Sequence, residues 1–496
     1  MIRSAALLLS GFQVRMSRIV MALSVILAVV LAVEFFSASG NRLFYPFLLE
    51  HTEGFVLQQF HAYRRGINLY SSPSIFHIGA MYPPGYYYFG ALFPVKLGGE
   101  LFVLRVVSFV SFCAVLATAL TVTAIRTRSL FYGVAICGAM IGIGKYTSCW
   151  FDLARVDSCS LFFSFAATAL VQTRPTTLGR ALICGFLLFI ALFIKQTAIF
   201  SLLGIVIYFG LGYMRSSVII ALSCLSLLLV AGLSLNIYYD GWFVRYLLLL
   251  PASQPYRMRN LLAQENLTLF MAAIPLFAVA LYRFSKCERS VWGTTFLMNL
   301  LCGALAAAKE GAAVNHFIPA VIFGIMVLGE GFKLEEDTGF GMLFSGSMLA
   351  LQLLIAAVKP STSTPPPEAF VEYEKLNEIL WRLPKPVLIW THHGFLVHEV
   401  QTNAVANRQA YVDIVWANRR EFGRWGQLVS NGVKWPFHSV ITYLGDDSPF
   451  LDQFRKLEDI DFTGDTWFGD PPFVFTIYEL RMPGNQSTPD PKLAQP

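Results

Sequence analysis

Long apolar runs constrain the fold of this chain more than any other feature, because a helix that crosses a bilayer needs about 20 consecutive apolar residues. Such runs recur over most of the 496 residues, and only 14% of the chain is charged, against about 25% in soluble domains. The sequence therefore predicts an α-helical polytopic membrane protein with about eleven transmembrane helices. The expected spans are 18–38, 102–123, 129–146, 157–173, 180–194, 197–213, 217–238, 267–284, 290–308, 314–330 and 340–358.

Basic residues at the ends of these spans set the expected orientation, since cytoplasmic loops are rich in Lys and Arg. The basic residues that gather on one side are Arg3, Arg15, Arg18, Arg126, Arg128, Arg174, Arg180, Arg215, Arg283, Lys286, Arg289 and Lys333. We therefore expect a multi-pass protein of the cell (inner or plasma) membrane, with its N-terminus in the cytoplasm. All eight His then fall on the outer side, which favours chemistry at that face over conduction through the membrane.

The predicted domains follow from changes in composition. Residues 1–358 form the transmembrane domain, and its outer first loop includes an apolar segment, 86–98, that is too short to span. We expect that segment to be an interfacial helix with its tyrosines at headgroup level. Residues 359–369 read as a Pro/Ser/Thr linker, 370–482 as a small soluble α/β domain outside the cell, and 483–496 as a disordered tail.

The composition of the C-terminal domain also predicts its elements, and the charge pattern excludes one class of partner. We expect a helix at 372–383, further helices near 398–428, and strands at 386–390, 439–444 and 473–480. The net charge is +6, but Lys and Arg form no clustered face of the kind that binds nucleic acid.

Two acids in the first outer loop are candidates for chemistry. Glu50 and Glu53 follow the first span, and Glu53 opens a helical pattern, where the helix dipole favours a carboxylate. One interpretation is a helix-capping acid in a solvated loop. The other is a general base that acts on an acceptor hydroxyl or amine.

Ionisable residues at the ends of later spans form two further candidate sites. Arg155 and Asp157 stand where a span begins, either as an interfacial ion pair or as groups that face a cavity. Lys195 lies between two apolar runs, where it either snorkels to the interface or binds a lipid phosphate.

A fourth candidate site is the short outer turn that contains Lys309, Glu310, Asn315 and His316. Each of these residues alone is accounted for by ordinary loop polarity. The meeting of four polar stretches on one face of the membrane is harder to explain in that way.

These stretches, in this order, resemble the GT-C superfamily of membrane glycosyltransferases, in the bacterial branch related to protein mannosyltransferases and aminoarabinose transferase. The resemblance covers about residues 15–330. Its motifs are Glu53–Gly54, Gly66 with Leu69–Tyr70, Tyr82–Pro83–Pro84, Arg155–Val156–Asp157, Lys195–Gln196–Thr197, and Gly311 with Asn315–His316.

The resemblance implies an enzyme of the cell envelope that moves a hexosyl or pentosyl group from a polyprenyl-phosphate donor. The acceptor would be a lipid, a glycan or a protein on the outer face. Carried onto this chain, the catalytic base is Glu53, the donor-phosphate ligands are Lys195, Arg155 and Lys309, and the substrate contacts are Asp157, Tyr82, Asn315 and His316.

One departure from the family pattern affects the base. Many relatives carry an Asp–Glu pair in the first loop, whereas Thr52 precedes Glu53 here, so Glu50 is a rival base. The departure also makes a metal-dependent mechanism less secure, although a divalent metal ion stays open. No His/Asp cluster has metal-ligand spacing, and the adjacent His392–His393 favour loop polarity.

Two other classes of function compete with the transferase. A transporter or flippase would carry ionisable groups near the midplane of interrupted helices, whereas the polar groups here lie at span ends. An O-antigen-ligase-like assembly protein would have a large loop between late spans, and the late loops here are short.

Overall fold

The computed structural model describes residues 2–73, 78–172, 176–285, 289–309, 312–330, 332, 339–360, 367–384, 387–390, 439–443, 454–462 and 473–480. The chain divides into two compact units. The first is helical and comprises Met1–Leu49, Gln59–Ser71 and Gly79–Thr364, and the second joins Glu50–Gln58 with the C-terminal residues from Pro365 onward.

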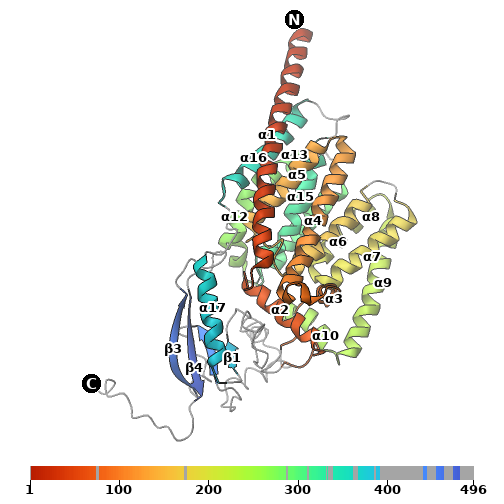
Figure 1. The fold of residues 1–496 in the computed structure, drawn as a ribbon. Coiled ribbons are helices and arrows are strands. Elements are labelled where there is room, and N and C mark those ends of the chain that lie inside the picture. The colour runs from red at the N-terminus through yellow and green to blue at the C-terminus, as the bar shows by residue number, and fades with distance from the viewer. Residues whose placement is uncertain are drawn as a thin grey trace. The chain divides into compact units, whose positions relative to one another are not determined.

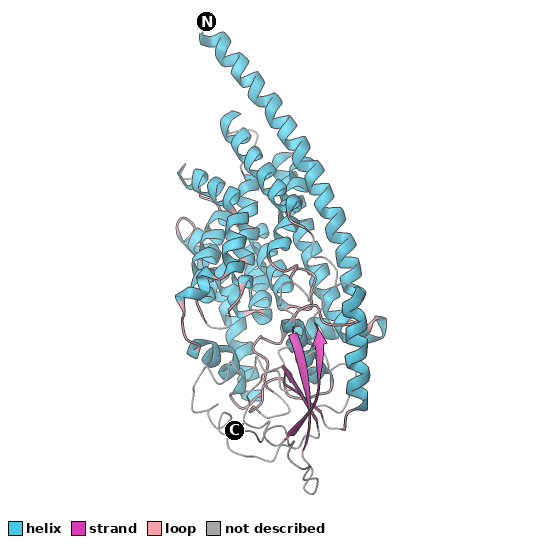
Figure 2. Cartoon of the chain, turned by 90° about the vertical axis from the view of Figure 1, so that its left-hand side faces the viewer, coloured by secondary structure: helices cyan, strands magenta, loops and turns pink. Residues whose placement is uncertain are grey.

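The helical unit is a bundle in which α1 (Ile2–Phe44) extends beyond the other helices at the end marked N (Figures 1 and 2). The other longer helices are α4 (Gly99–Thr127), α5 (Leu130–Ile143), α6 (Val156–Leu170), α7 (Leu178–Ile194), α8 (Ile199–Gly210), α9 (Met214–Tyr238), α12 (Gln264–Ala272), α13 (Ile274–Ser285), α14 (Val291–Ala307), α15 (Ile318–Glu330) and α16 (Gly339–Val358). The connections contain η1 (Val95–Leu97), η2 (Gly144–Tyr146), η3 (Gln196–Ala198), α10 (Trp242–Val244), the π-helix η4 (Arg245–Leu249), α11 (Leu250–Ser253), η5 (Met258–Leu262) and η6 (Val314–His316).

Small residues let the helices of this bundle approach closely, as is common between helices in membranes. A Cβ added at Gly142 of α5 would lie 2.5 Å from the Cβ of Ala356 in α16. Gly138, one turn earlier, faces Ala28 of α1 in the same way. The three helices α1, α5 and α16 therefore pack backbone against backbone.

Four helices in the described part of the chain are long and apolar enough to cross a membrane, namely α1, α4, α9 and α16. A fifth span results if the pair α12 and α13, bent by 60°, counts as one. The expected span 267–284 is thus two helices rather than one straight helix. Other apolar helices are shorter, so the total of about eleven spans stays a prediction.

The apolar surface of α9 shows what surrounds the bundle. In the most apolar 18-residue segment of this 25-residue helix, only 11% is buried inside the protein. Leu222, Leu229 and Val230 are each more than half exposed. Apolar side chains in such number on one helix surface are expected where lipid replaces water.

The expected interfacial helix at 86–98 is a short helix, α3 (Gly85–Ala91), followed by η1 after Pro94. We expected its tyrosines to lie at headgroup level, but not all of them lie at a surface. Tyr86 and Tyr87 are fully buried, and the Tyr86 hydroxyl donates to the carbonyl of Leu104, 2.7 Å away. The expectation was wrong for these two residues: α4 provides a polar partner for Tyr86, and the Tyr87 hydroxyl is buried without a partner among the described residues.

The second unit contains α17 (Pro367–Arg382) and a four-stranded sheet of order β1-β2-β4-β3. β1 (Val387–Trp390) pairs in parallel with β2 (Ser439–Tyr443), while β4 (Phe473–Leu480) pairs antiparallel with β2 and with β3 (Phe454–Phe462). The predicted helix at 372–383 and the predicted strands at 386–390, 439–444 and 473–480 coincide with α17, β1, β2 and β4. The charged strand β3 was not expected, and the helices near 398–428 and His392–His393 lie outside the described residues.

The α2 helix (His51–Arg64) belongs to both units, since the boundary falls between Gln58 and Gln59. In its helical-unit part, the His61 ring pairs with Glu100 of α4 at 2.8 Å. We expected helices in the first outer loop, and the structure has two there, α2 and α3.

Candidate functional site

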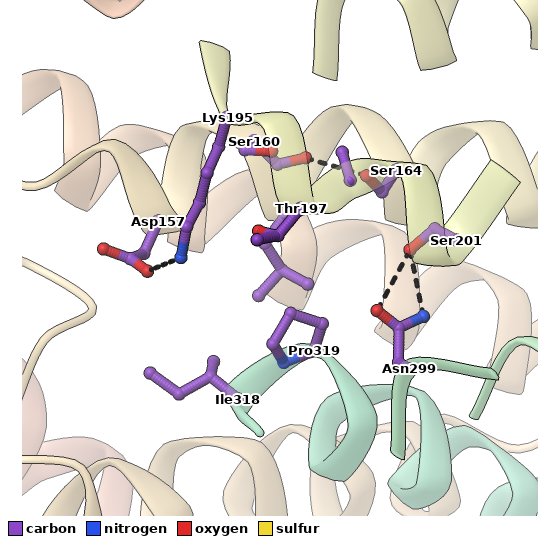
Figure 3. Close-up of a pocket in the computed structure, with 11 residues that line it drawn as sticks. Asp157, Ser160, Ser164, Lys195, Thr197, Ser201, Asn299, Ile318 and Pro319 are labelled. Carbon is purple, nitrogen blue, oxygen red and sulfur yellow. Dashed lines mark hydrogen bonds and ion pairs between the residues drawn. The ribbon is translucent and has the colours of Figure 1, made fainter. Parts of the chain in front are cut away.

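The centre of the candidate site is one carboxylate held by two cations. Asp157, in the first turn of α6, accepts from Lys195 Nζ at 2.6 Å and from Arg155 Nε at 3.1 Å (Figure 3 shows the Lys195 contact). The three side chains are between 3% and 7% exposed. This ion cluster, Arg155–Asp157–Lys195, carries a net charge of about +1 when all three groups are ionised.

Helix ends bring these residues together. Arg155 precedes α6 and Lys195 follows α7, and both have extended backbone conformations. α6 and α7 are consecutive and pack against each other, so the start of one lies beside the end of the other. The Arg155 guanidinium also lies 3.7 Å from the centre of the Trp150 ring, a cation–π contact that fixes its plane.

The Tyr82–Pro83–Pro84 motif lies beside the Lys195 turn. Gln196 Nε2 donates to the carbonyl of Met81 at 3.1 Å. Gly85 packs so tightly that an added Cβ would lie 2.5 Å from the Phe193 carbonyl oxygen. Two motifs that are more than a hundred residues apart are thus joined at the ion cluster.

Tyr70 also contacts the Tyr82–Pro83–Pro84 motif. Its hydroxyl donates to the carbonyl of Tyr82 at 2.6 Å, and its ring packs on Tyr239 and Phe243. Burial raises the pKa of Tyr70 well above its ordinary value, so its hydroxyl keeps the proton that it donates.

The fourth stretch also reaches the cluster. His316 of η6 is close enough to Lys195, Asp157 and Arg155 for their charges to act on its ring. Asn315 is buried beside it. The structure therefore joins Arg155, Asp157 and Lys195 and brings His316 within reach of their charges, while Tyr82 and Asn315 are chain neighbours of residues that reach this cluster.

Four buried polar atoms around the cluster lack a hydrogen-bond partner within the described part of the chain. They are Trp150 Nε1, Gln196 Oε1, Asn315 Oδ1 and His316 Nδ1. Unpaired buried polar groups are costly, and each calls for an explanation such as a ligand or water. Trp150, Gln196 and His316 adjoin the ion cluster, so a polar ligand or water beside it can pair with their free atoms.

Lys309 has a different environment from the one expected of a phosphate ligand. Its ammonium donates to the carbonyl of Pro251 at 2.7 Å and lies 5.2 Å from the centre of the Tyr256 ring. Its own carbonyl accepts from Asn260 Nδ2 at 2.9 Å. Lys309 thus fastens the connection between α11 and η5 to the end of α14.

The two acids of the first loop lie in the second unit. Glu53 is completely buried in the first turn of α2. Glu50 accepts from the backbone N–H of Thr52 at 3.0 Å and from its hydroxyl at 2.8 Å. These contacts give Glu50 a capping function at the start of α2.

Sequence reasoning missed a second set of buried charges. Arg105 of α4 is fully buried and donates to the carbonyls of Arg42, Tyr45 and Phe47 at 2.8, 2.6 and 2.7 Å. Arg42 itself pairs with Asp152 at 2.7 Å. A single Arg inside the expected span 102–123 was the available signal, since a charge at membrane depth needs partners.

A narrow polar pocket extends from the ion cluster between α6, α8, α14 and the start of α15 (Figure 3). Asp157 and Lys195 line one end, and Ser201 and Asn299 line the other. Within the described residues, no three His, Cys, Asp or Glu side chains are grouped as metal ligands.

Comparison with solved structures identifies the architecture. ArnT from Cupriavidus metallidurans in the apo state aligns with a TM-score of 0.57, covering 91% of this chain and 97% of that one at 10% identity. The same protein bound to undecaprenyl phosphate aligns with a TM-score of 0.56, again at 10% identity and with the same coverage.

The chain has a GT-C fold. ArnT is an aminoarabinose transferase and a membrane glycosyltransferase of the GT-C superfamily, so the predicted resemblance is confirmed for the fold. A mostly helical, multi-pass membrane protein is likewise confirmed. No family model matches the sequence. No curated protein matches it either.

Proposed function

We propose that this protein is a glycosyltransferase that moves a sugar from a polyprenyl-phosphate donor to an acceptor at the outer face of the cell membrane. The observation that carries the proposal is the buried ion cluster Arg155–Asp157–Lys195 within a GT-C fold. Undecaprenyl phosphate is bound by the ArnT structure that shares this fold, which supports a donor of that class.

Lys195 and Arg155 are the proposed ligands of the donor phosphate. An ammonium group has three N–H donors, and Asp157 takes one of those of Lys195. Asp157 offsets the repulsion between the two cations, so both stay beside each other in a site that excludes water. Fixed cations stabilise the charge that develops on a leaving phosphate, which is usually a large part of catalysis.

The unpaired polar atoms support a ligand with both donors and acceptors. Trp150 Nε1 can donate to a phosphate oxygen, while Gln196 Oε1 and Asn315 Oδ1 can accept from sugar hydroxyls. A glycosyl phosphate presents both kinds of group, unlike a simple anion or an apolar lipid.

Glu53 is the proposed general base, with Glu50 as the rival. In the proposed step, the acceptor oxygen or nitrogen forms a bond to the anomeric carbon of the sugar. The bond between that carbon and the phosphate oxygen breaks, and its electron pair leaves with the polyprenyl phosphate. The proton of the acceptor passes to the Glu53 carboxylate.

The contacts of Glu50 favour Glu53 in this assignment. Both Glu50 oxygens accept from Thr52, so protonation of Glu50 would weaken the start of α2. Lys309, which the resemblance also offered as a phosphate ligand, stays a weaker candidate, because the Pro251 carbonyl accepts one of its three N–H groups.

The decisive experiment is transfer of a radiolabelled sugar by the purified full-length protein. A panel of polyprenyl-phosphate hexoses and pentoses serves as donors, with lipid, glycan and peptide acceptors. We expect Glu53→Gln to lower transfer by about 100- to 10,000-fold, the usual contribution of a general base. Glu50→Gln is the matched control and should keep most of the activity.

The same assay can reject the proposal. A folded protein that transfers no sugar from any donor and binds no polyprenyl phosphate would favour a transporter or an assembly protein instead. Equal losses in both variants would leave the enzyme class standing and remove the assignment of the base.

A further inference from the structure

The pocket beside the ion cluster is lined by short polar side chains that come from three helices. Ser160 and Ser164 are four residues apart and share one face of α6, while Ser201 belongs to α8 and Asn299 to α14. Each is between 1% and 4% exposed. Four polar side chains within a membrane bundle are costly unless they serve packing or a ligand.

Hydrogen bonds inside the protein already use the protons of these side chains. The Ser160 hydroxyl donates to the carbonyl of Ala191 at 3.0 Å, and the Ser164 hydroxyl donates to the carbonyl of Ser160 at 3.1 Å. Asn299 Nδ2 donates to Ser201 Oγ at 3.0 Å and to the carbonyl of Thr295 at 2.9 Å.

What remains on these side chains is the capacity to accept. A hydroxyl has two lone pairs beside its single proton, and an amide oxygen also has two. Ser201 gives its proton to Asn299 Oδ1 over 3.5 Å, a long contact that leaves this oxygen open to a better donor. At the Ser201–Asn299 end of the pocket, away from Lys195, an entering group must therefore donate a hydrogen bond.

The size of the pocket limits that group further. The space open to the centres of water-sized molecules is about 20 Å³, which is about one water molecule. Apolar side chains, Leu161, Ile318 and Pro319, close its walls. A hydroxyl or amino group fits such a space, whereas an acetamido group does not.

We propose that this pocket receives one small hydrogen-bond donor, a hydroxyl or an amino group, of the donor sugar and so selects the sugar. It excludes acetamido and carboxylate substituents by size, since the space holds about one water molecule. The inference rests on the proposed function, since it takes the donor phosphate to lie at Lys195 and Arg155.

The first test compares three donors on the same polyprenyl phosphate: a hexose or pentose with only hydroxyl or amino substituents, an N-acetylhexosamine, and a hexuronic acid. We expect transfer from the first to exceed transfer from the other two by at least about 10-fold, the effect of one misfitting group in a pocket. Equal transfer from the N-acetylhexosamine or the uronic acid would overturn the inference while leaving the proposed function intact.

The second test changes the pocket itself. Ile318→Ala removes part of one wall, and we expect it to increase transfer from the N-acetylhexosamine donor. Ile322→Ala is the matched control, because Ile322 is buried one turn further along α15 and does not line the pocket. A gain of the same size in both variants would contradict the inference.

The third test distinguishes binding of the donor sugar from binding of the donor phosphate. Ser164→Val removes an acceptor and adds a carbon, so the sugar-bearing donor should bind about 10- to 200-fold more weakly. Binding of bare polyprenyl phosphate should not change, and Thr168→Val, one turn away on α6, should change neither. Equal weakening of both ligands by Ser164→Val would refute the pocket's role, and a wild-type protein that binds no bare polyprenyl phosphate would refute the proposed function itself.

Discussion

Removal of Asp157 offers the sharpest test of the ion cluster, because the carboxylate and the proposed phosphate would act on the same two cations. The oxygens of Asp157 hold Lys195 Nζ at 2.6 Å and Arg155 Nε at 3.1 Å. In Asp157→Asn these cations keep their positions but lose the charge between them.

The expected cost follows from the geometry. The two cations lie within about 8 Å of each other and repel by about 2 kcal/mol at an effective dielectric constant of about 20, and Asp157→Asn removes the negative charge that offsets this repulsion in the wild type. Two charge-assisted hydrogen bonds also become weaker, at about 1 kcal/mol or more each. We therefore expect Asp157→Asn to lower the free energy of unfolding by about 3–5 kcal/mol, in line with other broken buried pairs.

Lys195→Met should cost less, about 2 kcal/mol, because Arg155 still neutralises Asp157. The assay is unfolding of the detergent-solubilised protein by SDS, with and without polyprenyl phosphate. The phosphate should stabilise Asp157→Asn more than it stabilises the wild type, since it replaces the lost negative charge. It should stabilise Lys195→Met less than the wild type.

A matched control is Asp152→Asn, which breaks the buried pair with Arg42 at 2.7 Å, three residues before Arg155 in the chain. This variant should be destabilised, and polyprenyl phosphate should stabilise it by the same amount as the wild type. The reasoning is refuted if the phosphate stabilises Asp157→Asn and Asp152→Asn equally, because the two cations would then not be its binding site.

Three other outcomes are expected. Arg105→Met should lower the free energy of unfolding by at least about 3 kcal/mol, because three buried carbonyls lose their donor; an unchanged unfolding curve would contradict this. Gly85→Ala should lower donor binding and stability, by about 1–3 kcal/mol, since its Cβ would meet the Phe193 carbonyl at 2.5 Å, whereas Gly232→Ala, where nothing lies within 4 Å, should do neither. A reporter enzyme fused after Ser361 should be active outside the cell and silent inside; activity in the cytoplasm would show that the number of spans is wrong by one.

The helices of the bundle were largely predictable, because hydropathy and helix length are properties of a local sequence window. The expected span 102–123 lies within α4 and 217–238 within α9. The bend between α12 and α13 was missed, since both halves are apolar and hydropathy averages over them. Pro275 was the overlooked signal: it lacks an N–H, and its ring clashes with the carbonyl of the preceding turn.

The candidate site was predictable as a set of residues but not as a set of contacts. Arg155 with Asp157, and Lys195, were each expected at the end of a span, and the ends of consecutive spans meet at one face of a membrane. Their joint ion cluster depends on side-chain geometry across 38 residues, which no local window contains. The two interpretations of Arg155 and Asp157 are compatible. The two side chains form an ion pair, and Asp157 also lines the pocket.

The polar pocket itself was not predicted, for a related reason. Ser160, Ser164 and Asn299 occur singly in apolar runs, where small polar residues commonly bond to their own helix. Only the packing of α6 on α8 and α14 makes them face one space. Lys309, a cation in a conspicuous turn, donates to a carbonyl of its own chain, a contact that no local pattern predicts, and its role at the donor stays a prediction.

The ion cluster also limits how this protein can change in evolution. Loss of Lys195 or Arg155 alone weakens the pairing of a buried acid, and loss of Asp157 alone leaves two buried cations in repulsion. Each single substitution is therefore harmful, while an exchange that keeps all three charges is tolerable. We expect relatives to keep the three charges at positions 155, 157 and 195 or to lose them together, even where the rest of the sequence has diverged as far as it has from ArnT.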